Sequence, residues 1–473
     1  MWFRKGKIVK AGESNINLNH FYKSVFVLVI PLALQNLINV GVTAADVIML
    51  GRVGESVLAG AAIANQIQFI MILLLFGLGS GITVLAAQYW GKGDKGTIEK
   101  ILAMGMRISF VITLFFNVLA VLIPTYLLQI FTREAEVIAN GRIYLQIVAF
   151  SYVFMGITMT YLLVMRSIQR VIVATVVYSC SLVVNVILNF ILIFGISFGF
   201  GALHIDTPAL GIQGAAIGTV FARILEVLLI FIYARFFNKD VKFRWKNLFQ
   251  TDKVLLKDFI RYAMPVVGNE AIWGVAISAN TAILGHLGSE AIAANSVAQV
   301  VRQLATVVSF GLASTTAIYL GKTIGEKKFE EAKVYAKKFT QLSLIMGVVG
   351  GILILIASSF VVEFMVLSQR AAGYLQFMLI VMAYYVVAQA YNATFIVGIS
   401  RAGGDTKFGL YADTFSMWTG SLLLAFLAGY VFRFSVPVVY VLLMADELIK
   451  VPLSALRYKS FKWLKNVTRE FGT

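Results

Sequence analysis

Charged residues are scarce in this chain of 473 residues, at 13% of the sequence, whereas soluble domains contain about 25%. Long polar stretches are scarce as well, because the longest polar connection between apolar runs spans only residues 236–261. That leaves no room for a soluble catalytic domain. Hydrophobic residues make up 59% of the chain, and its mean hydropathy is +0.85. This composition excludes a water-soluble protein and predicts an all-α integral membrane protein.

Cysteine, histidine and catalytic motifs are also nearly absent. Cys180 is the single cysteine, so no disulfide can form within the chain, and the compartment is not indicated. The three histidines, at positions 20, 204 and 286, stand at or beyond the ends of apolar runs and form no metal-binding group. The sequence contains no HExxH or GxSxG motif, and "GKGDKG" at 91–96 lacks phosphate-loop spacing. We therefore expect neither an enzyme nor a bound cofactor.

Basic residues exceed acidic ones by 40 to 23, which gives a net charge of +17. Such a balance can mark nucleic-acid binding. Here, however, most Lys and Arg lie in the N-terminal tail, the even-numbered connections between apolar runs and the C-terminal tail, which is the positive-inside distribution. Residues 1–23 are polar and lack a cleavage signal. We expect both termini in the cytoplasm, contact of the basic loops with anionic membrane lipid, and no nucleic-acid partner.

A dozen apolar runs, each of about 20 residues or more, are long enough to cross a bilayer. The predicted spans are 25–50, 58–90, 98–131, 137–166, 171–199 and 210–237, followed by 258–286, 290–320, 330–366, 372–400, 407–432 and 436–457. Twelve spans place both termini on one side. The predicted domains are an N-terminal tail (1–24), an N-lobe (25–237), a cytoplasmic linker (238–257), a C-lobe (258–457) and a C-terminal tail (458–473).

The two halves repeat at a shift of 234 positions. This shift places Pro31 on Pro265, "LGRVG" at 50–54 on "LGHLG" at 284–288, "FGLGS" at 76–80 on "FGLAS" at 310–314, and Gly91 on Gly325 without a gap. Because six spans separate equivalent positions, the copies share one orientation and should be related by an axis along the membrane normal. The repeat predicts two pseudo-symmetric six-helix lobes around a central cavity, a geometry suited to alternating access.

Several motifs of this sequence resemble the multidrug and toxic compound extrusion (MATE) family. They are "IPLALQ" and "ADVIMLGRVG" within 30–54, "AAQYWGKGD" at 86–94, "NVILNFILIFG" at 185–195, "PALGIQGAAIGT" at 208–219 and "SRAGGDTK" at 400–407. The resemblance covers nearly the whole chain. It implies an efflux carrier of the cell membrane that exchanges organic compounds, often lipophilic cations, for incoming Na⁺ or protons. We expect the carrier to act as a monomer.

The first predicted span carries one polar face and one proline. Asn39, Thr43 and Asp46 follow helical spacing, and an intramembrane carboxylate such as Asp46 is costly enough to indicate function. Pro31 lies 15 residues earlier and removes a helical hydrogen bond. We hypothesise that ligation or neutralisation of Asp46 repacks this helix about Pro31 as a hinge. The alternative is a static kink.

The fifth predicted span carries a second polar stripe at intervals of four residues, formed by Ser181, Asn185 and Asn189. If this stripe faces Asp46, carboxylate, amide and hydroxyl oxygens meet in the N-lobe, and hard cations favour such ligands. The resemblance assigns a cation or proton site to Asp46, Asn185, Asn189 and Thr219, with Na⁺ as a possible ligand of the first three. With one titratable group, the choice between Na⁺ and a proton stays open. Asparagine stripes also serve simply as contacts between helices.

Candidate substrate residues lie in the C-lobe. Glu270 and Asp413 could attract a cationic substrate, with Trp273 and Tyr391 among the aromatic residues that could face it, although such aromatic residues are commonly packing residues. The repeat places Glu270 opposite Asn36 and Asn280 opposite Asp46. Some MATE branches pair a Glu on the seventh span with an Asp on the tenth, but residues 372–400 contain no acid. A second ion site in the C-lobe is therefore not predicted.

The main alternative function is a flippase for a lipid-linked glycan precursor, since such proteins share this architecture. A flippase should carry more cationic residues in its cavity to meet pyrophosphate. In this sequence, the charges on the candidate cavity helices are mostly acidic. The sequence therefore favours a cation-coupled exporter of organic compounds.

Overall fold

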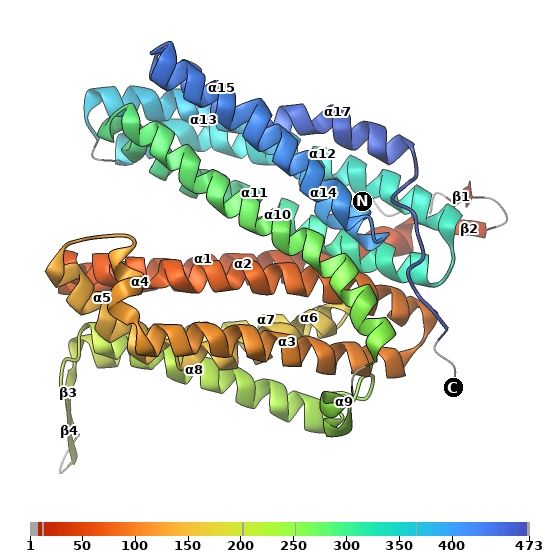
Figure 1. Ribbon diagram of the computed structural model, residues 1–473, viewed down its shortest axis with the longest axis horizontal. Coiled ribbons are helices and arrows are strands. Elements are labelled where there is room, and N and C mark those ends of the chain that lie inside the picture. The colour runs from red at the N-terminus through yellow and green to blue at the C-terminus, as the bar shows by residue number, and fades with distance from the viewer. Residues whose placement is uncertain (1–7, 12–13, 201–202, 251, 366, 471–473) are drawn as a thin grey trace.

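The computed structural model describes residues 8–11, 14–200, 203–250, 252–365 and 367–470. Long helices dominate these residues and form two lobes (Figure 1). The N-lobe contains α1 (Leu18–Val53), α2 (Glu55–Lys92), α3 (Lys95–Leu122), α4 (Pro124–Gln129), α5 (Ala135–Val148), α6 (Ser151–Ser167), α7 (Val171–Phe194), α8 (Ile212–Ile232) and the π-helical η1 (Tyr233–Phe237). The short helix α9 (Trp245–Phe249) follows in the linker.

The C-lobe begins with the long helices α10 (Lys253–His286), α11 (Ser289–Gly325) and α12 (Phe329–Phe364). It continues with α13 (Gln369–Ala393), η2 (Thr394–Ser400), α14 (Thr406–Asp413), η3 (Thr414–Leu422), α15 (Leu423–Phe426), η4 (Leu427–Val431), α16 (Val436–Leu443) and α17 (Asp446–Lys459). Each predicted span thus corresponds to one helix or to consecutive helical segments. The fold is the twelve-span, two-lobe architecture that the repeat predicts.

Length and apolarity alone would identify fewer spans. Nine helical segments of the described residues are long and apolar enough to cross a membrane, and the bent pair α5 and α6, which meet at 52°, makes a tenth. The other two predicted spans are α10, which carries Asn269, Glu270 and Asn280 in its middle, and the pair α16 and α17, which is interrupted at residues 444–445. Polar residues inside these helices therefore weaken the hydropathy signal.

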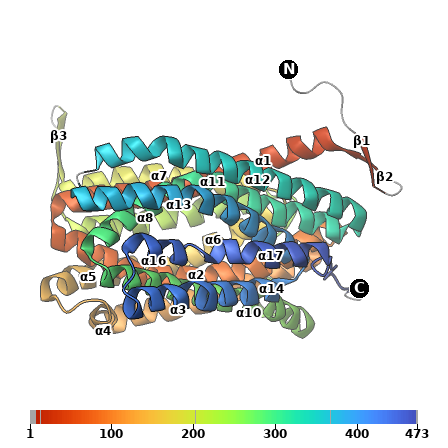
Figure 2. The ribbon, with the colours of Figure 1, turned by 90° about the horizontal axis from the view of Figure 1, so that it is seen from above.

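One span boundary is corrected. The predicted fifth span extends to residue 199, but α7 ends at Phe194, and Gly195 has a positive φ of 71° that a helix cannot continue through. Strand β3 (Ile196–Phe200) then pairs antiparallel with β4 (Leu203–Thr207), with Ile196 opposite Thr207. Strands β1 (Ile8–Ala11) and β2 (Ser14–Asn17) form a second hairpin in the N-terminal tail. Figure 2 shows the two hairpins at opposite ends of the bundle.

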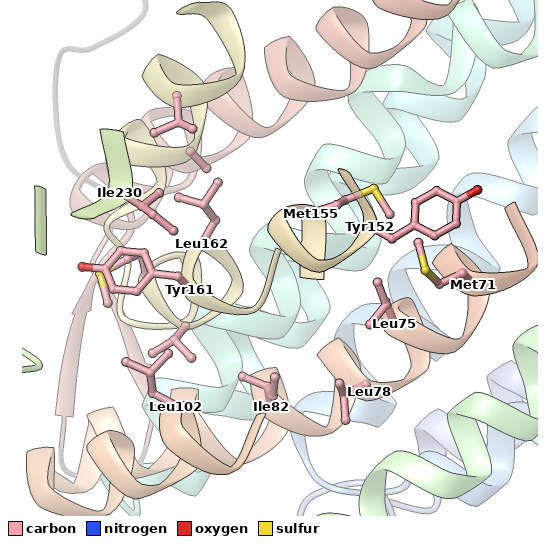
Figure 3. Packing of buried hydrophobic residues seen from close by; sticks show 14 of the residues in the cluster. Met71, Leu75, Leu78, Ile82, Leu102, Tyr152, Met155, Tyr161, Leu162 and Ile230 are labelled. Carbon is pink, nitrogen blue, oxygen red and sulfur yellow. The ribbon is translucent and has the colours of Figure 1, made fainter. Parts of the chain in front are cut away.

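The core of the N-lobe forms around α2. Buried side chains of α2, including Met71, Leu75 and Ile82, pack against residues of α3 and α6 (Figure 3). Burial of a large apolar side chain stabilises by about 1.5–3 kcal/mol in water, whereas between helices in lipid close packing provides much of the stabilisation. The same helix, α2, also meets the other lobe.

The lobes meet where α2 and α11 cross, and small residues make the approach possible. A Cβ atom on Gly91 would lie 2.0 Å from the carbonyl oxygen of Lys322, and one on Gly325 would lie 2.0 Å from that of Gln88. The repeat relates these two contacts to each other. Gly321 would meet its own repeat equivalent, Ala87, at 2.8 Å. The pseudo-twofold axis therefore passes beside this crossing, which confirms the internal repeat in three dimensions.

A second pair of contacts obeys the same symmetry. A Cβ atom on Gly77 of α2 would lie 2.6 Å from the Cα atom of Val267 on α10. One on Gly311 of α11 would lie 3.1 Å from the backbone nitrogen of Ala33 on α1. Gly77 is equivalent to Gly311, and Ala33 to Val267. The first two helices of each lobe therefore pack against those of the other lobe.

The crossing lies near the end of the molecule that carries the basic connections. This end, here called the basic end, contains residues 92–95, 239–250, 252–253 and 459–470. The C-terminal tail crosses it: the backbone N–H of Val467 donates to Gln88 Oε1 at 2.7 Å, and Arg469 pairs with Asp258. Gln88 Nε2 donates to the carbonyl of Ala402 at 2.7 Å. The lobes are joined at the basic end and diverge toward the distal end, where β3 and β4 lie (Figure 1).

Gly91→Ala is expected to separate the two lobes at the basic end, because the added methyl group meets the backbone oxygen of Lys322, which cannot rotate away. Overpacking of this kind costs about 1–3 kcal/mol. Spin labels on Lys100 and Lys337, in a background lacking Cys180, should report a longer distance between the lobes than in the parent. Gly373→Ala is the control, since a Cβ atom there meets nothing within 4 Å. An unchanged distance distribution in Gly91→Ala would contradict the role of this contact.

Candidate functional site

The N-lobe brings Asp46 of α1 and Asn189 of α7 into direct contact. Asn189 Nδ2 donates a hydrogen bond to Asp46 Oδ1 at 2.7 Å, across 143 positions of sequence. The same amide nitrogen lies 3.4 Å from Asn185 Oδ1, one helical turn away. Asn185 and Asn189 are buried, at 3% and 0% exposure. Asp46 of the first polar stripe therefore contacts Asn189 of the second, a meeting that the spacing within each stripe left open.

One acceptor in this group lacks a partner. Asn189 Oδ1 is buried and has no hydrogen bond within the described residues. It packs against α8, where a Cβ atom on Gly218 would lie only 2.2 Å from it. A buried amide oxygen without a partner is costly. This oxygen is thus free to accept a hydrogen bond or to coordinate an ion.

Thr219 joins the group through a tyrosine. Its hydroxyl donates to the carbonyl of Ala215 at 3.0 Å. Tyr144 of α5 forms side-chain hydrogen bonds with Thr219 and Asn65 and interacts electrostatically with Asp46. Tyr144 and Asn65 therefore belong to this polar group although their sequence context, within apolar helices, gives no signal of it. In the part of the chain that the structure describes, the hydrogen bonds of Thr219 and Asp46 do not join these two residues directly.

A basic residue lies close to this polar group. Arg223 of α8 pairs with Glu226 at 2.7 Å, as their spacing of three predicts, and the same carboxylate accepts from Ser181 at 2.7 Å. Arg223 also attracts Asp46 electrostatically. The local charges are therefore Asp46, Arg223 and Glu226. Their formal charges sum to one negative charge, which a bound monovalent cation would neutralise.

Pro31 lies in α1 close to the helix that carries the asparagines. Its carbonyl oxygen accepts a hydrogen bond from Thr175 Oγ1 of α7 at 3.3 Å. Gln35, one turn later, donates to the carbonyl of Val171 at 3.1 Å and to Thr175 Oγ1 at 2.7 Å. The α1–α7 interface thus contains the proline and the Asp46–Asn189 contact at its two ends. Any shift of α1 against α7 changes both.

The two C-lobe carboxylates that the sequence suggests for substrate binding are each paired with a basic residue. Glu270 of α10 accepts a hydrogen bond from Arg401 Nη2 at 3.3 Å. Asp413, at the end of α14, contacts Lys450 Nζ at 2.9 Å and accepts from Asn269 Nδ2 at 2.7 Å. Their charges are therefore compensated inside the protein.

Lys450 of α17 lies at the centre of a buried group of charges. Besides Asp413, its ammonium contacts Glu447 at 2.8 Å and Asp446 at 3.4 Å. Asn392 donates to Glu447 Oε2 at 2.8 Å. All of these side chains are buried, with Lys450 at 4% exposure. One lysine thus contacts three carboxylates from two helices. We call these residues the Lys450 group.

Sequence reasoning missed the Lys450 group, although Asp446, Glu447 and Lys450 stand at the spacing of ion pairs on one helix face, inside an apolar span. Trp273 and Tyr391, the suggested aromatic residues, are half-buried in the C-lobe. Trp273 packs on the C-lobe core. Neither residue lines the cavity between the lobes.

That cavity, here called the central cavity, has walls from both lobes. It is lined by residues of α1, α2 and α6 on one side and of α11 and the segment around η2 on the other. Its charged lining residues are Arg166 of α6 and Arg401, which follows η2. Ser80 and Ser314, which the repeat relates, face it from α2 and α11. Neither arginine was identified as a candidate from sequence.

Comparison with known proteins gives a consistent result. The family model described as MatE matches residues 31–191 and 272–451. The probable multidrug resistance protein YoeA of Bacillus subtilis is 23% identical over 95% of this chain and 96% of its own length. The probable multidrug resistance protein NorM of Thermotoga maritima is 22% identical over 95% of both chains. A multidrug resistance MATE family transporter solved in an outward-facing conformation superposes with a TM-score of 0.83 at 16% identity, covering 93% of this chain and 96% of that one.

Proposed function

The chain belongs to the MatE family of multi-pass membrane transporters, and on that premise we propose that it exports organic compounds from the cell by cation-coupled antiport. In this proposal the transporter lies in the plasma membrane as a monomer, with its basic end and both termini in the cytoplasm, since that end carries the Lys- and Arg-rich connections. The flippase alternative is not proposed, because the named relatives are multidrug resistance proteins.

The Asp46–Asn189 contact is the observation that supports ion coupling most directly. A carboxylate, the amide oxygens of Asn185 and Asn189 and the Tyr144 and Thr219 hydroxyls lie around α1, α5, α7 and α8. Rotation of the Asn189 amide would turn its unpartnered oxygen toward the carboxylate. Such oxygens suit Na⁺, by analogy with other hard cations. Protonation of Asp46 would neutralise the same site without a metal ion.

The arrangement of the lobes supports alternating access. They are joined by the α2–α11 crossing at the basic end and diverge at the distal end (Figure 1), which corresponds to an outward-facing state if the basic end is cytoplasmic. Binding of an ion at Asp46 replaces the hydrogen bond from Asn189 and so alters the α1–α7 interface. A ligand can shift this equilibrium only by binding one state better than the other.

Pro31→Ala tests whether that interface must bend. If Pro31 acts as a hinge, the restored helical hydrogen bond stiffens α1, and ion-driven export should slow several-fold while dye binding stays at the parental level. Export should be measured in proteoliposomes at saturating dye. Parental export would mean that the proline is a static kink.

The proposed function is tested with the purified full-length protein in proteoliposomes. Uptake and release of fluorescent dyes should be followed while Na⁺ and pH gradients are imposed independently. Dye should move against its own gradient only when one of the two ion gradients is present, and the gradient that drives it identifies the coupling ion. Transport that ignores both gradients would refute ion-coupled antiport.

A further inference from the structure

The central cavity contains one arginine from each lobe. Their positions differ by 235, one more than the shift of the repeat, and they correspond through the backbone turns that follow them. Arg166 stands three residues before Gln169, which has a positive φ of 65°, and Arg401 stands three residues before Gly404, with a φ of 75°. Both arginines end a helical segment that faces the cavity. The matching backbone turns show that the two side chains occupy corresponding places in the lobes.

The charges of the two arginines are compensated differently. Arg401 has the carboxylate of Glu270 at 3.3 Å. The repeat places Asn36 where Glu270 stands, so the N-lobe offers an amide in place of the acid. Among the described residues no Asp or Glu is found in an ion pair with Arg166, whose Nε is buried without a hydrogen bond. Its guanidinium lies 5.7 Å from the ring centroid of Tyr178. The cavity therefore holds about one uncompensated positive charge.

The remaining walls combine hydroxyl donors with apolar surface. Ser80, Thr83 and Ser314 line the cavity together with Leu32 and Phe76. The free volume is about 90 Å³, which holds a few water molecules or a small polar group. Val84 and Ile318, also in the lining, precede Ala87 and Gly321 of the lobe contact by one helical turn. The central cavity therefore lies one helical turn from the contact between the lobes.

We propose that the central cavity binds the carboxylate of an amphipathic organic anion. Arg166 is its principal hydrogen-bond donor, and the serine and threonine hydroxyls are further donors. This inference rests on the proposed transport function and assigns its substrate class. The buried Nε of Arg166 has no hydrogen-bond acceptor and no carboxylate is paired with this arginine among the described residues, and a carboxylate matches the donor geometry of a guanidinium. The acidic residues that had suggested a cationic substrate, Glu270 and Asp413, are already paired with Arg401 and Lys450.

The test is equilibrium binding to the purified full-length protein in detergent at neutral pH. Fluorescence polarisation of fluorescein, an anionic dye with a carboxylate, is compared with that of the cationic dye ethidium. Benzoate should displace fluorescein, and neutral benzamide of the same shape should not. Tighter binding of ethidium than of fluorescein, or equal displacement by benzamide, would overturn the proposal.

Three variants locate the interaction. Arg166→Gln should raise the Kd for fluorescein about tenfold or more, since it removes a charge-assisted hydrogen bond, and Arg166→Lys should retain most of the affinity. Asn36→Glu should weaken fluorescein binding while Arg166 is intact, because it recreates the ion pair of the C-lobe. Ethidium binding should not weaken in any of them. Parental fluorescein affinity in both Arg166→Gln and Asn36→Glu would overturn the assignment.

This measurement requires no ion gradient, so it is independent of the antiport test. Arginine-dependent fluorescein binding without gradient-driven export would refute the proposed function and leave the anion site standing. Ion-driven export of cationic dyes alone, with no arginine-dependent binding, would refute the anion site and leave the function standing.

Discussion

Asp46→Asn is expected to reduce ion-driven export to the background of empty proteoliposomes while the protein still folds. The amide has the size of the carboxylate and can still accept the hydrogen bond that Asn189 donates at 2.7 Å. It cannot bind a proton in the physiological range, and it supplies no negative charge for Na⁺. The carrier should therefore lose coupling under either ion, and dye counterflow in the absence of a gradient should separate this loss from a loss of substrate binding.

Glu55→Gln provides a matched control for that experiment. Glu55 is an exposed carboxylate in the first turn of α2, so its neutralisation removes one negative charge without entering the lobe. Its export should equal that of the parent. If Asp46→Asn also pumped at the parental rate against a gradient, the ion site would have to lie elsewhere in the chain.

Lys450→Met is expected to have the largest effect on stability. It leaves Asp413, Asp446 and Glu447 buried without their common counter-ion, and breaking a buried ion pair on one side costs about 3–5 kcal/mol. Thermal unfolding in detergent, followed by the loss of the monodisperse peak in size-exclusion chromatography, should occur at a markedly lower temperature than in the parent.

Two further variants separate charge from packing. Lys459→Met changes an exposed lysine near the end of the same helix and should leave the unfolding temperature near that of the parent. Adding Asp446→Asn and Glu447→Gln to Lys450→Met should recover much of the lost stability, since fewer buried charges then lack a partner. An unfolding temperature of Lys450→Met that matches the parent would show that these carboxylates are already neutral.

The Lys450 group also clarifies the difference between the lobes. Each lobe contains a contact between an aspartate and an asparagine, Asp46 with Asn189 and Asp413 with Asn269, both at 2.7 Å. In the C-lobe the ammonium of Lys450 lies 2.9 Å from the carboxylate, so the chain itself supplies a cation at that contact. The N-lobe has no such lysine in contact with Asp46 among the described salt bridges. This asymmetry supports a single exchangeable ion, bound in the N-lobe.

The sequence by itself determined the helical spans, the repeat and the polar face of the first helix, because these depend on local hydropathy and on helical spacing. It also placed Asp46 and Asn189 each on a polar stripe with a period of about four residues, but it left open whether the two stripes face each other. It could not place the end of α7, where Gly195 adopts a positive φ. The added residues of the site, Tyr144 and Asn65, lie on apolar helices and leave no pattern.

Only the tertiary structure decided which charges are free. Glu270 and Arg401 are 131 positions apart, and Asp413 and Lys450 are 37 apart, so no spacing rule links them. Whether such residues pair depends on the rotation and tilt of packed helices, and a rotation of one residue, about 100°, would turn each side chain to another neighbour. For this reason the acidic residues of the C-lobe suggested a cationic substrate from sequence, whereas the folded protein pairs them and leaves Arg166 facing the central cavity.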